Sequence, residues 1–360
     1  MIPPKSDYSK SPPPLKREKG FVTSSSDGQF RSSSRIPRSQ YTAWPPAYTT
    51  VSKYLKAFKV ATAWSLGIKN TVKTNARNWN EARRDPNGEI LIFRPDASAA
   101  RMRKSAAFVS MPEVPEDLFL ESVYLAVRRN AEYVCPHEVE GSLYIRPFQF
   151  GSSCQIGLEP PDEFLFCVFV QPHIGFHGRG AIKALVLDEF DRAATRGSGA
   201  VKVGCNYAPV IRWTTEARKE GYNVLLHVDS QTQTEIDEFS TSGFIGIQNG
   251  EGETVVVIAN SKAAIESITT DSAAKIAAAL GWRVEKRTVR LAELPTFTEV
   301  LAAGTASGLA PVSSIHRKST KETFEFLPGG SSYQTLWGKL KSIQNGTAVD
   351  DFGWCHKLLE

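Results

Sequence analysis

Residues 164–170 form an uninterrupted apolar run, Phe164-Leu165-Phe166-Cys167-Val168-Phe169-Val170. A strand with one face in water alternates apolar and polar residues, whereas a strand covered on both faces is apolar throughout. No apolar run in the chain reaches the length of a membrane span. The run therefore predicts a strand in the middle of a sheet, inside a chain long enough to bury a sizeable core.

Periodicity places further elements on both sides of this strand. The strand itself is expected at residues 163–171, and other strands at 89–93, 143–150, 181–186, 223–228, 243–247 and 254–259. Helices are expected at 97–109, 115–131 and 207–220, and from Thr270 or Asp271 to Leu280, with Gly221 and Gly281 ending the last two. Residues 296–302 resemble a short helix, and 304–315 a loop followed by a strand. This mixture predicts an α/β fold.

Composition divides the chain into segments. Residues 1–48 are rich in Ser, Pro and basic residues, with eight Lys or Arg against three Asp or Glu in the first forty, and we expect a disordered tail. Residues 49–87 form an atypical segment of uncertain fold. A small domain is expected at 88–171, a linker with three glycines and a proline at 172–180, and a larger domain at 181–360.

Charge and cysteine usage narrow the function classes. The net charge of +5 comes mostly from the tail, so composition gives no case for nucleic acid as a partner. The five cysteines are scattered, which is typical of reduced thiols in an intracellular protein. The basic start also resembles a mitochondrial presequence, so the compartment, cytoplasmic or mitochondrial, stays open. His173 and His177 are four apart, but Pro172 and nearby glycines argue against a helix, and no metal is expected.

One lysine stands in a setting suited to covalent chemistry. Lys202 lies among small residues, with Tyr207 five positions on. Burial lowers the pKa of a lysine, and the neutral amine can condense with an aldehyde. The segment 234–239 supplies carboxylates, including Glu238. A Schiff-base lysine and a carboxylate for a pyridinium nitrogen are two parts that a pyridoxal-phosphate site needs.

Five motifs then agree, in order, with one family. The chain resembles the branched-chain amino acid aminotransferases, which have fold type IV, over about residues 88–360. The motifs are Phe93-Arg94-Pro95-Asp96 with Arg101-Met102-Arg103-Lys104-Ser105-Ala106, Leu143-Tyr144-Ile145-Arg146-Pro147, Lys202-Val203-Gly204-Cys205-Asn206-Tyr207, Ile268-Thr269-Thr270-Asp271-Ser272, and Ala303-Gly304-Thr305-Ala306 with Pro311-Val312. The resemblance implies a small N-terminal α/β domain, a larger C-terminal pseudo-barrel domain, pyridoxal 5'-phosphate as cofactor, and a homodimer whose small-molecule substrates are amino acids and 2-oxo acids.

The resemblance also implies roles for the cofactor-facing residues. Lys202 is the Schiff-base lysine, and Glu238 faces the pyridine nitrogen. Tyr207 contacts the ring hydroxyl, although a core tyrosine is the competing interpretation. The phosphate is assigned to Arg101, Ile268, Thr269 and Thr305, and helix capping by Thr269 is compatible with that role.

Substrate residues follow in the same way. Tyr144 and Arg146 share one face of a strand, and the resemblance implies that they recognise substrate, including the distal carboxylate of glutamate. A structural, cross-strand Arg146 is the alternative. Thr305 and Ala306 are implied at the substrate α-carboxylate. Arg192 has a family counterpart near the cofactor, but a salt bridge within its loop is an equal possibility.

Four departures from the family affect the functional hypothesis. Cys205 replaces a glycine, Gly243 an asparagine and Thr270 an arginine, and the Phe-Glu-Gly motif of the pocket wall is not found. The leading hypothesis is a transaminase that passes an amino group between a branched-chain or similar apolar L-amino acid and 2-oxoglutarate. The alternatives are a transaminase of secondary metabolism with an altered substrate, and a non-catalytic homologue that lacks the N-terminal pocket wall.

Overall fold

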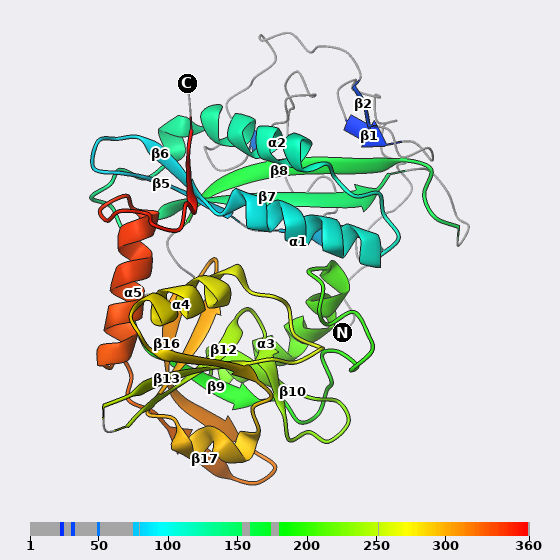
Figure 1. Cartoon of the computed structure of the whole chain (residues 1–360). Helices are drawn as coiled ribbons and strands as arrows, with labels where there is room; N and C mark the ends of the chain where they lie inside the picture. Colours follow the sequence, from blue (N-terminus) through cyan, green and yellow to red (C-terminus); the bar gives the residue numbers. More distant parts are fainter. Residues whose placement is uncertain are drawn as a thin grey trace, which may run out of the picture.

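The computed structural model describes residues 22–24, 30–32, 49–50, 75–78, 80–152, 159–173, 180–250 and 252–358. Figure 1 shows two sheets, one above the other, with helices α1 and α4 facing each other between them. The α/β fold expected from the sequence is confirmed. Most of the predicted tail 1–48, the greater part of segment 49–87, and residues 174–179 of the predicted linker lie outside the described residues.

The first sheet has the strand order β18-β6-β5-β7-β8-β1-β2, with β4 beside β7 and β3 beside β8. All of its described pairings are antiparallel. Its strands are β1 (Val22–Ser24), β2 (Phe30–Ser32), β3 (Thr49–Thr50), β4 (Asn75–Arg77), β5 (Asn80–Arg84), β6 (Ile90–Phe93), β7 (Ser142–Gly151), β8 (Phe164–His173) and β18 (Cys355–Lys357). The apolar run is β8, which has a strand on either side, as its sequence predicts.

Two helices cover one face of this sheet, α1 (Pro95–Phe108) and α2 (Glu116–Arg128), followed by the 3₁₀ turn η2 (Ala131–Tyr133). The core between them includes Met102 of α1, Phe119 of α2 and Phe166 of β8, and the two phenyl rings stack at 6.0 Å. Burial of such side chains contributes roughly 1.5–3 kcal/mol each. This packing fixes α1, which carries Arg101 and Ser105, against the sheet.

The second sheet has the order β11-β10-β9-β16-β15-β12-β13-β14, with β17 beside β16. Its strands are β9 (Ile182–Val186), β10 (Val224–Val228), β11 (Ile236–Phe239), β12 (Gly243–Asn249), β13 (Thr254–Ala259), β14 (Arg283–Arg287), β15 (Glu299–Gly304), β16 (Gly308–Arg317) and β17 (Glu322–Glu325). Three pairings are parallel, β9 with β10, β9 with β16, and β13 with β14, and the others are antiparallel.

The helices of this part of the chain are α3 (Ile211–Lys219), α4 (Ile268–Ala279) and α5 (Ser331–Gln344), with 3₁₀ turns η3 (Gly204–Asn206), η4 (Ala208–Val210) and η5 (Leu291–Thr296). Helices α4 and α5 pack on one face of the sheet, where Ile276, Leu336 and Leu340 are buried. The other face has its own core, which includes Phe239 and Phe244. After α5 the chain returns to the first sheet, where β18 pairs with β6.

Three predicted elements are wrong in part. Residues 296–302, expected as helix, contain the start of β15, because strands β12 and β16 pair with it on both sides and bury it completely. The helix expected at 207–220 begins only at Ile211, after the 3₁₀ turn η4, which contains Pro209, a residue with no N–H to donate. The cap of α4 is Ser267 rather than Thr270 or Asp271, because its hydroxyl accepts the Thr270 N–H at 3.2 Å.

The sequence analysis also missed three strands within the segment 49–87, of which β3 pairs with β8. Strands β4 and β5 both pair with β7, and Glu81 of β5 lies opposite Tyr144. The segment therefore contributes to the first sheet next to the Tyr144 motif, where the sequence analysis found no pocket wall. The first sheet thus extends on both sides of the range 88–171, since β18 also joins it.

Candidate active site

The loop that carries Lys202 is fixed by its neighbours. The side-chain amide of Asn206 donates to the carbonyls of Ser198 at 2.7 Å and Val201 at 2.8 Å. The backbone N–H of Lys202 donates to the hydroxyl of Ser105 on α1 at 3.0 Å. The position of this lysine is therefore set from within its loop and from the first sheet's helix.

The Lys202 side chain is buried, with 6% exposure, and its Nζ lies 2.9 Å from the hydroxyl oxygen of Tyr207. Burial lowers the pKa of Lys202 well below its usual 10.5, and the nearby positive charge of Arg101 lowers it further. A buried amine with a depressed pKa is neutral in a larger fraction of molecules near pH 7. Such an amine has the lone pair that attack on an aldehyde requires.

Glu238 lies on β11 with both carboxylate oxygens engaged. Oε1 is 3.0 Å from Nη2 of Arg192, and Oε2 accepts the backbone N–H of Ile265 at 3.1 Å. Burial raises the pKa of Glu238, while Arg192 and the Ile265 N–H oppose that rise by stabilising the ionised form. Arg192 thus forms its buried ion pair with the residue assigned to the cofactor, on β11, and not with a residue of its own loop.

Arg101 and the start of α4 form a cationic corner. Arg101 donates from Nε to the Asn78 side chain at 3.2 Å and from Nη1 to the Glu266 carbonyl at 3.2 Å. Burial lowers the pKa of Arg101 to about 10, so it remains charged at neutral pH. Ile268 and Thr269 open helix α4, and their N–H groups precede the first intrahelical bond. Together they offer a charge and N–H donors to an anion.

Ser267 joins this corner to the turn after β15. Its hydroxyl donates to the Ala303 carbonyl at 3.0 Å while it caps α4. Thr305 follows in the turn between β15 and β16. One small cavity is lined by Arg101, Lys202, Tyr207, Glu238, Ser267 and Thr305, among others. Five of the predicted site residues therefore line this one cavity. Two more, Ile268 and Thr269, directly follow Ser267 in the sequence, and Ser267 also lines it.

The predicted substrate residues Tyr144 and Arg146 lie on β7 of the first sheet. The guanidinium of Arg146 is 5.3 Å from the ring centre of Tyr144 and 5.5 Å from that of Phe169. Its charge also lowers the pKa of Lys202, which places it within electrostatic range of the cavity. Nε2 of His173 lies 3.2 Å from the Ala306 carbonyl oxygen, so the end of β8 contacts the turn that holds Thr305.

The donor set fits pyridoxal phosphate. A buried amine with a lowered pKa is available for an aldehyde, a buried carboxylate paired with Arg192 for a ring nitrogen, and a cation with helix N–H groups for a phosphate. Lys202, Glu238 and Arg101 supply these groups around one cavity. The Cys205 side chain is exposed and is not among the residues lining that cavity, so the thiol does not narrow it.

Sequence reasoning missed the residues that hold this site in place. Ser105 and Asn78 fix Lys202 and Arg101, respectively. Ser105 stands four residues after Arg101 in a quoted motif, which puts both on one face of α1 and was an available signal. Asn78 gave no such signal, because it lies before the region of resemblance.

The part of the chain that the structure describes shows no group of three or more His, Cys, Asp or Glu side chains arranged for a metal, and His177 lies outside it. Within those same residues, no helix has a stretch long and apolar enough to cross a bilayer.

Comparison with known proteins gives a consistent result. The family model described as amino-transferase class IV matches residues 81–315. Aminotransferase TOXF of Cochliobolus carbonum is 58% identical over 284 residues, covering 77% of this chain and 80% of that protein. Branched-chain amino acid aminotransferase gloG of Glarea lozoyensis is 44% identical over 281 residues, covering 76% and 78%.

Solved structures share the fold. The branched-chain amino acid aminotransferase of Escherichia coli superimposes with a TM-score of 0.71 at 22% identity, covering 87% of this chain and 100% of that one. The enzyme of the same name from Thermobaculum terrenum, in its pyridoxal-phosphate form, gives 0.69 at 19% identity, covering 96% and 100%.

Proposed function

Because the chain belongs to the class IV aminotransferases, we propose that it passes an amino group between a branched-chain or similar apolar L-amino acid and 2-oxoglutarate. The chain is a transaminase, and its cofactor is pyridoxal 5'-phosphate. The observation that carries the proposed site is the buried Lys202 amine, 2.9 Å from Tyr207, on the same cavity as Glu238 and Arg101.

Bound pyridoxal phosphate supplies an aldehyde that takes up the amino group and a ring that withdraws electrons from the substrate carbon. In this proposal Lys202 holds the cofactor through Nζ, then accepts and returns a substrate proton at that atom. Glu238 holds the proton on the ring nitrogen through its carboxylate. Arg101 and the N–H groups of Ile268 and Thr269 hold the phosphate, with the Thr305 hydroxyl beside them.

Substrate recognition is assigned to Thr305, which lines the cavity, and to residues near it on both sheets. Arg146 supplies a cation for the distal carboxylate of 2-oxoglutarate or glutamate, and Tyr144 shares its face of β7. Thr305 and Ala306 bind the α-carboxylate. An apolar donor is supported by the resemblance of the motifs and by the name of the Glarea lozoyensis relative.

A transaminase of secondary metabolism with a different donor is the second candidate. Two of the departures from the family, Gly243 and Thr270, lie against each other: a Cβ added at Gly243 would meet the Thr270 Oγ1 at 2.6 Å. A pair of changes at one place, next to residues that also line the cavity, supports an altered site. The substrate pocket itself retains Tyr144 and Arg146, which is why we place this candidate second.

An amino-donor panel separates the two. The purified protein, loaded with pyridoxal phosphate, is assayed with 2-oxoglutarate and each amino acid, and glutamate formation is measured. We expect the highest kcat/KM for Leu, Ile or Val. Turnover confined to another class of donor would replace the first candidate by the second. If none of the amino acids yields glutamate, both candidates are contradicted.

We also propose that the chain forms a homodimer, as the resemblance implies, and that it divides into a small domain, a linker and a larger domain near residues 172–180. Sedimentation equilibrium of the holoenzyme tests the first point, with a mass of twice 39.6 kDa expected. A mass of one chain at assay concentrations would contradict it.

A further inference from the structure

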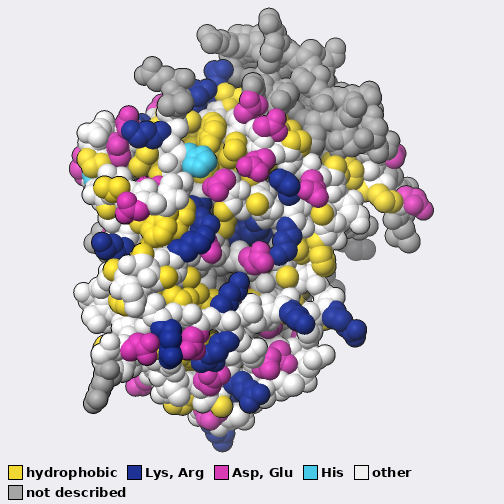
Figure 2. Space-filling view, in the orientation of Figure 1, with side chains coloured by type: hydrophobic (Ala, Val, Ile, Leu, Met, Phe, Trp, Pro, Cys, Tyr) yellow, Lys and Arg dark blue, Asp and Glu magenta, His cyan; other side chains and the backbone are white. Residues whose placement is uncertain are grey.

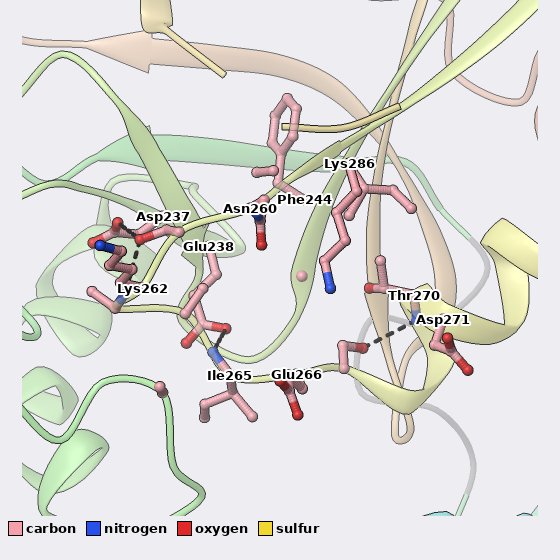
Figure 3. Close-up of a pocket in the computed structure, with 18 of the residues that line it drawn as sticks. Asp237, Glu238, Phe244, Asn260, Lys262, Ile265, Glu266, Thr270, Asp271 and Lys286 are labelled. Carbon is pink, nitrogen blue, oxygen red and sulfur yellow. Dashed lines mark hydrogen bonds between the residues drawn. The ribbon is translucent and has the colours of Figure 1, made fainter. Parts of the chain in front are cut away.

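A large cleft of ≈ 1070 Å³ lies directly beside the cavity of Lys202. Figure 3 shows its interior, between the segment that carries Ile265 and Glu266 and the strands that carry Phe244 and Lys286. The cleft and the Lys202 cavity share Arg101, Glu238, Gly243, Ile265 and Ser267 as wall residues. We call this space the rear cleft, lined by Phe244, Asn260, Ile265, Thr270 and Lys286 among others.

Gly243, in the wall between the rear cleft and the Lys202 cavity, has no side chain, and the buried hydroxyl of Thr270 lies against it. A Cβ at Gly243 would come within 2.6 Å of the Thr270 Oγ1. Thr270 is 7% exposed, and its Oγ1 has no hydrogen-bond partner among the described residues. Leaving a buried hydroxyl unsatisfied costs about 1–3 kcal/mol. An occupant of the rear cleft that accepts a hydrogen bond from this hydroxyl would remove that cost.

A cation is directed into the same end of the cleft. Lys286 is an exposed residue of β14 that makes no ion pair with any described residue, and Figure 3 shows its side chain extending into the cleft on the side of Thr270. The carboxamide of Asn260 projects from the neighbouring strand end. An ammonium, a hydroxyl and a carboxamide can all donate to a single anion.

The carboxylates nearby do not cancel this charge. Asp271 is paired with Arg94 at 2.6 Å and with Lys275 at 3.0 Å, and Glu266 is paired with Lys104 at 2.9 Å. Figure 3 places Asp237 at the opposite end of the cleft, beside Lys262. In the surface view of Figure 2, Lys and Arg side chains gather across the middle of the molecule, where α1 faces α4.

The rest of the lining is mixed. Phe244, Ile258, Ala263, Ala264 and Ile265 form an apolar part of it, and the charged residues Asp229, Glu235, Asp237 and Lys262 line it as well. A pocket with an apolar floor and a few convergent donors suits a small molecule with one acidic group and an apolar body.

We propose that the rear cleft is a second binding site, distinct from the transamination site, for a small apolar carboxylate. Lys286 and Thr270 bind its carboxylate, and Phe244 and Ile265 contact its apolar part. Because the Ile265 N–H also donates to Glu238 at 3.1 Å, the occupant touches the segment that holds the cofactor's carboxylate partner.

The test is calorimetric titration of the holoenzyme with 3-methylbutanoate. The wild type is compared with Lys286→Met and Thr270→Val, with Thr305→Val for the transamination site, and with Lys183→Met as a matched control. Lys183 is an exposed strand lysine that does not line the rear cleft. Circular dichroism at the start confirms that each variant is folded.

We expect two sites per chain in the wild type and in Lys183→Met. Lys286→Met and Thr270→Val should weaken one of these sites at least tenfold and leave the other unchanged, whereas Thr305→Val should do the reverse. A single site that responds only to Thr305→Val would overturn the proposal, as would two sites that Lys286→Met and Thr270→Val leave untouched. Either result is independent of the donor panel, which reports on the transamination site alone.

Discussion

The Lys202 amine and the Tyr207 hydroxyl lie 2.9 Å apart, on the wall of one cavity. A hydrogen bond to a group that gains and loses charge contributes roughly 1.5–3 kcal/mol. We therefore expect Tyr207→Phe to lower kcat by roughly ten- to a hundredfold while the protein stays folded, because only the hydroxyl is removed.

The measurement is kcat together with the visible absorption of the bound cofactor. Tyr222→Phe is the matched control, since the Tyr222 hydroxyl bonds to His316, away from the residues that line the cavity. An unchanged kcat and an unchanged absorption spectrum in Tyr207→Phe would assign this tyrosine to the core only.

The ion pair between Arg192 and Glu238 is buried, with side chains 2% and 6% exposed. Removing one partner leaves an unpaired buried charge, at a cost of roughly 3–5 kcal/mol. We expect Arg192→Met to lower the free energy of unfolding of the apoenzyme by that amount, and the double variant Arg192→Met/Glu238→Gln to recover part of the loss. Urea unfolding of the four proteins in the cycle measures the coupling, and additive losses would contradict the pairing.

Arg94 ties α1 to the first turn of α4. Its Nη1 donates to Asp271 at 2.6 Å and to Ser272 at 2.8 Å, and its backbone N–H donates to the Trp354 carbonyl at 2.7 Å. This contact sets the start of α4, with its N–H groups, relative to Arg101.

We expect Arg94→Lys to weaken binding of pyridoxal phosphate to the apoenzyme about tenfold, or about 1.4 kcal/mol, because the lysine ammonium is a point charge on a different stem and does not place its donors where Nη1 of Arg94 lies. The Kd is measured by fluorescence titration. Arg103→Lys, an exposed residue on the same helix, should bind as the wild type does. Equal affinities for Arg94→Lys and the wild type would show that the tie does not position the phosphate site.

His227 is 1% exposed, and its Nε2 lies 3.0 Å from the Ser240 hydroxyl. Burial, with the nearby charge of Arg192, lowers the pKa of His227 from 6.5 to about 3. The unfolded chain therefore binds a proton below about pH 6.5 that the folded protein does not bind. Its contribution to stability is complete above that pH and decreases as the pH falls towards 3.

Between pH 7 and pH 5, the contribution of His227 to the free energy of unfolding is expected to fall by about 2 kcal/mol. We expect the free energy of unfolding to fall by that much more in the wild type than in His227→Gln, as measured by urea unfolding at the two pH values. Equal losses in the two proteins would mean that His227 is not held neutral in the fold.

Much of the fold follows from local patterns in the chain. The apolar run of β8 specified a central strand, and the glycines at 221 and 281 both have positive φ, at 90° and 79°, as helix-ending residues do. Strand β13 has the predicted bounds, Thr254–Ala259. The helix predicted at residues 296–302 was wrong, because β12 and β16 pair with β15 and determine its conformation.

In the candidate site, too, some residues could be predicted from local motifs and others could not. Lys202, Glu238 and Arg101 could be named because each belongs to a motif with chemical requirements of its own. Ser105 could have been suspected because it shares a face of α1 with Arg101, but its bond to Lys202, the bond of Asn78 to Arg101 and the Arg192–Glu238 pair join segments up to 97 residues apart. The meeting of Gly243 with Thr270 is likewise visible only in three dimensions, although both positions had been noted as unusual.

The most direct test of the account is the identity of the amine that binds the cofactor. The holoenzyme is reduced with borohydride, digested, and mapped by mass spectrometry, alongside Lys202→Ala and the control Lys183→Met. We predict that the reduced cofactor is attached to Lys202 in the wild type and in the control, and that Lys202→Ala carries no label and forms no glutamate. Label on any other lysine, or turnover by Lys202→Ala, would contradict the account.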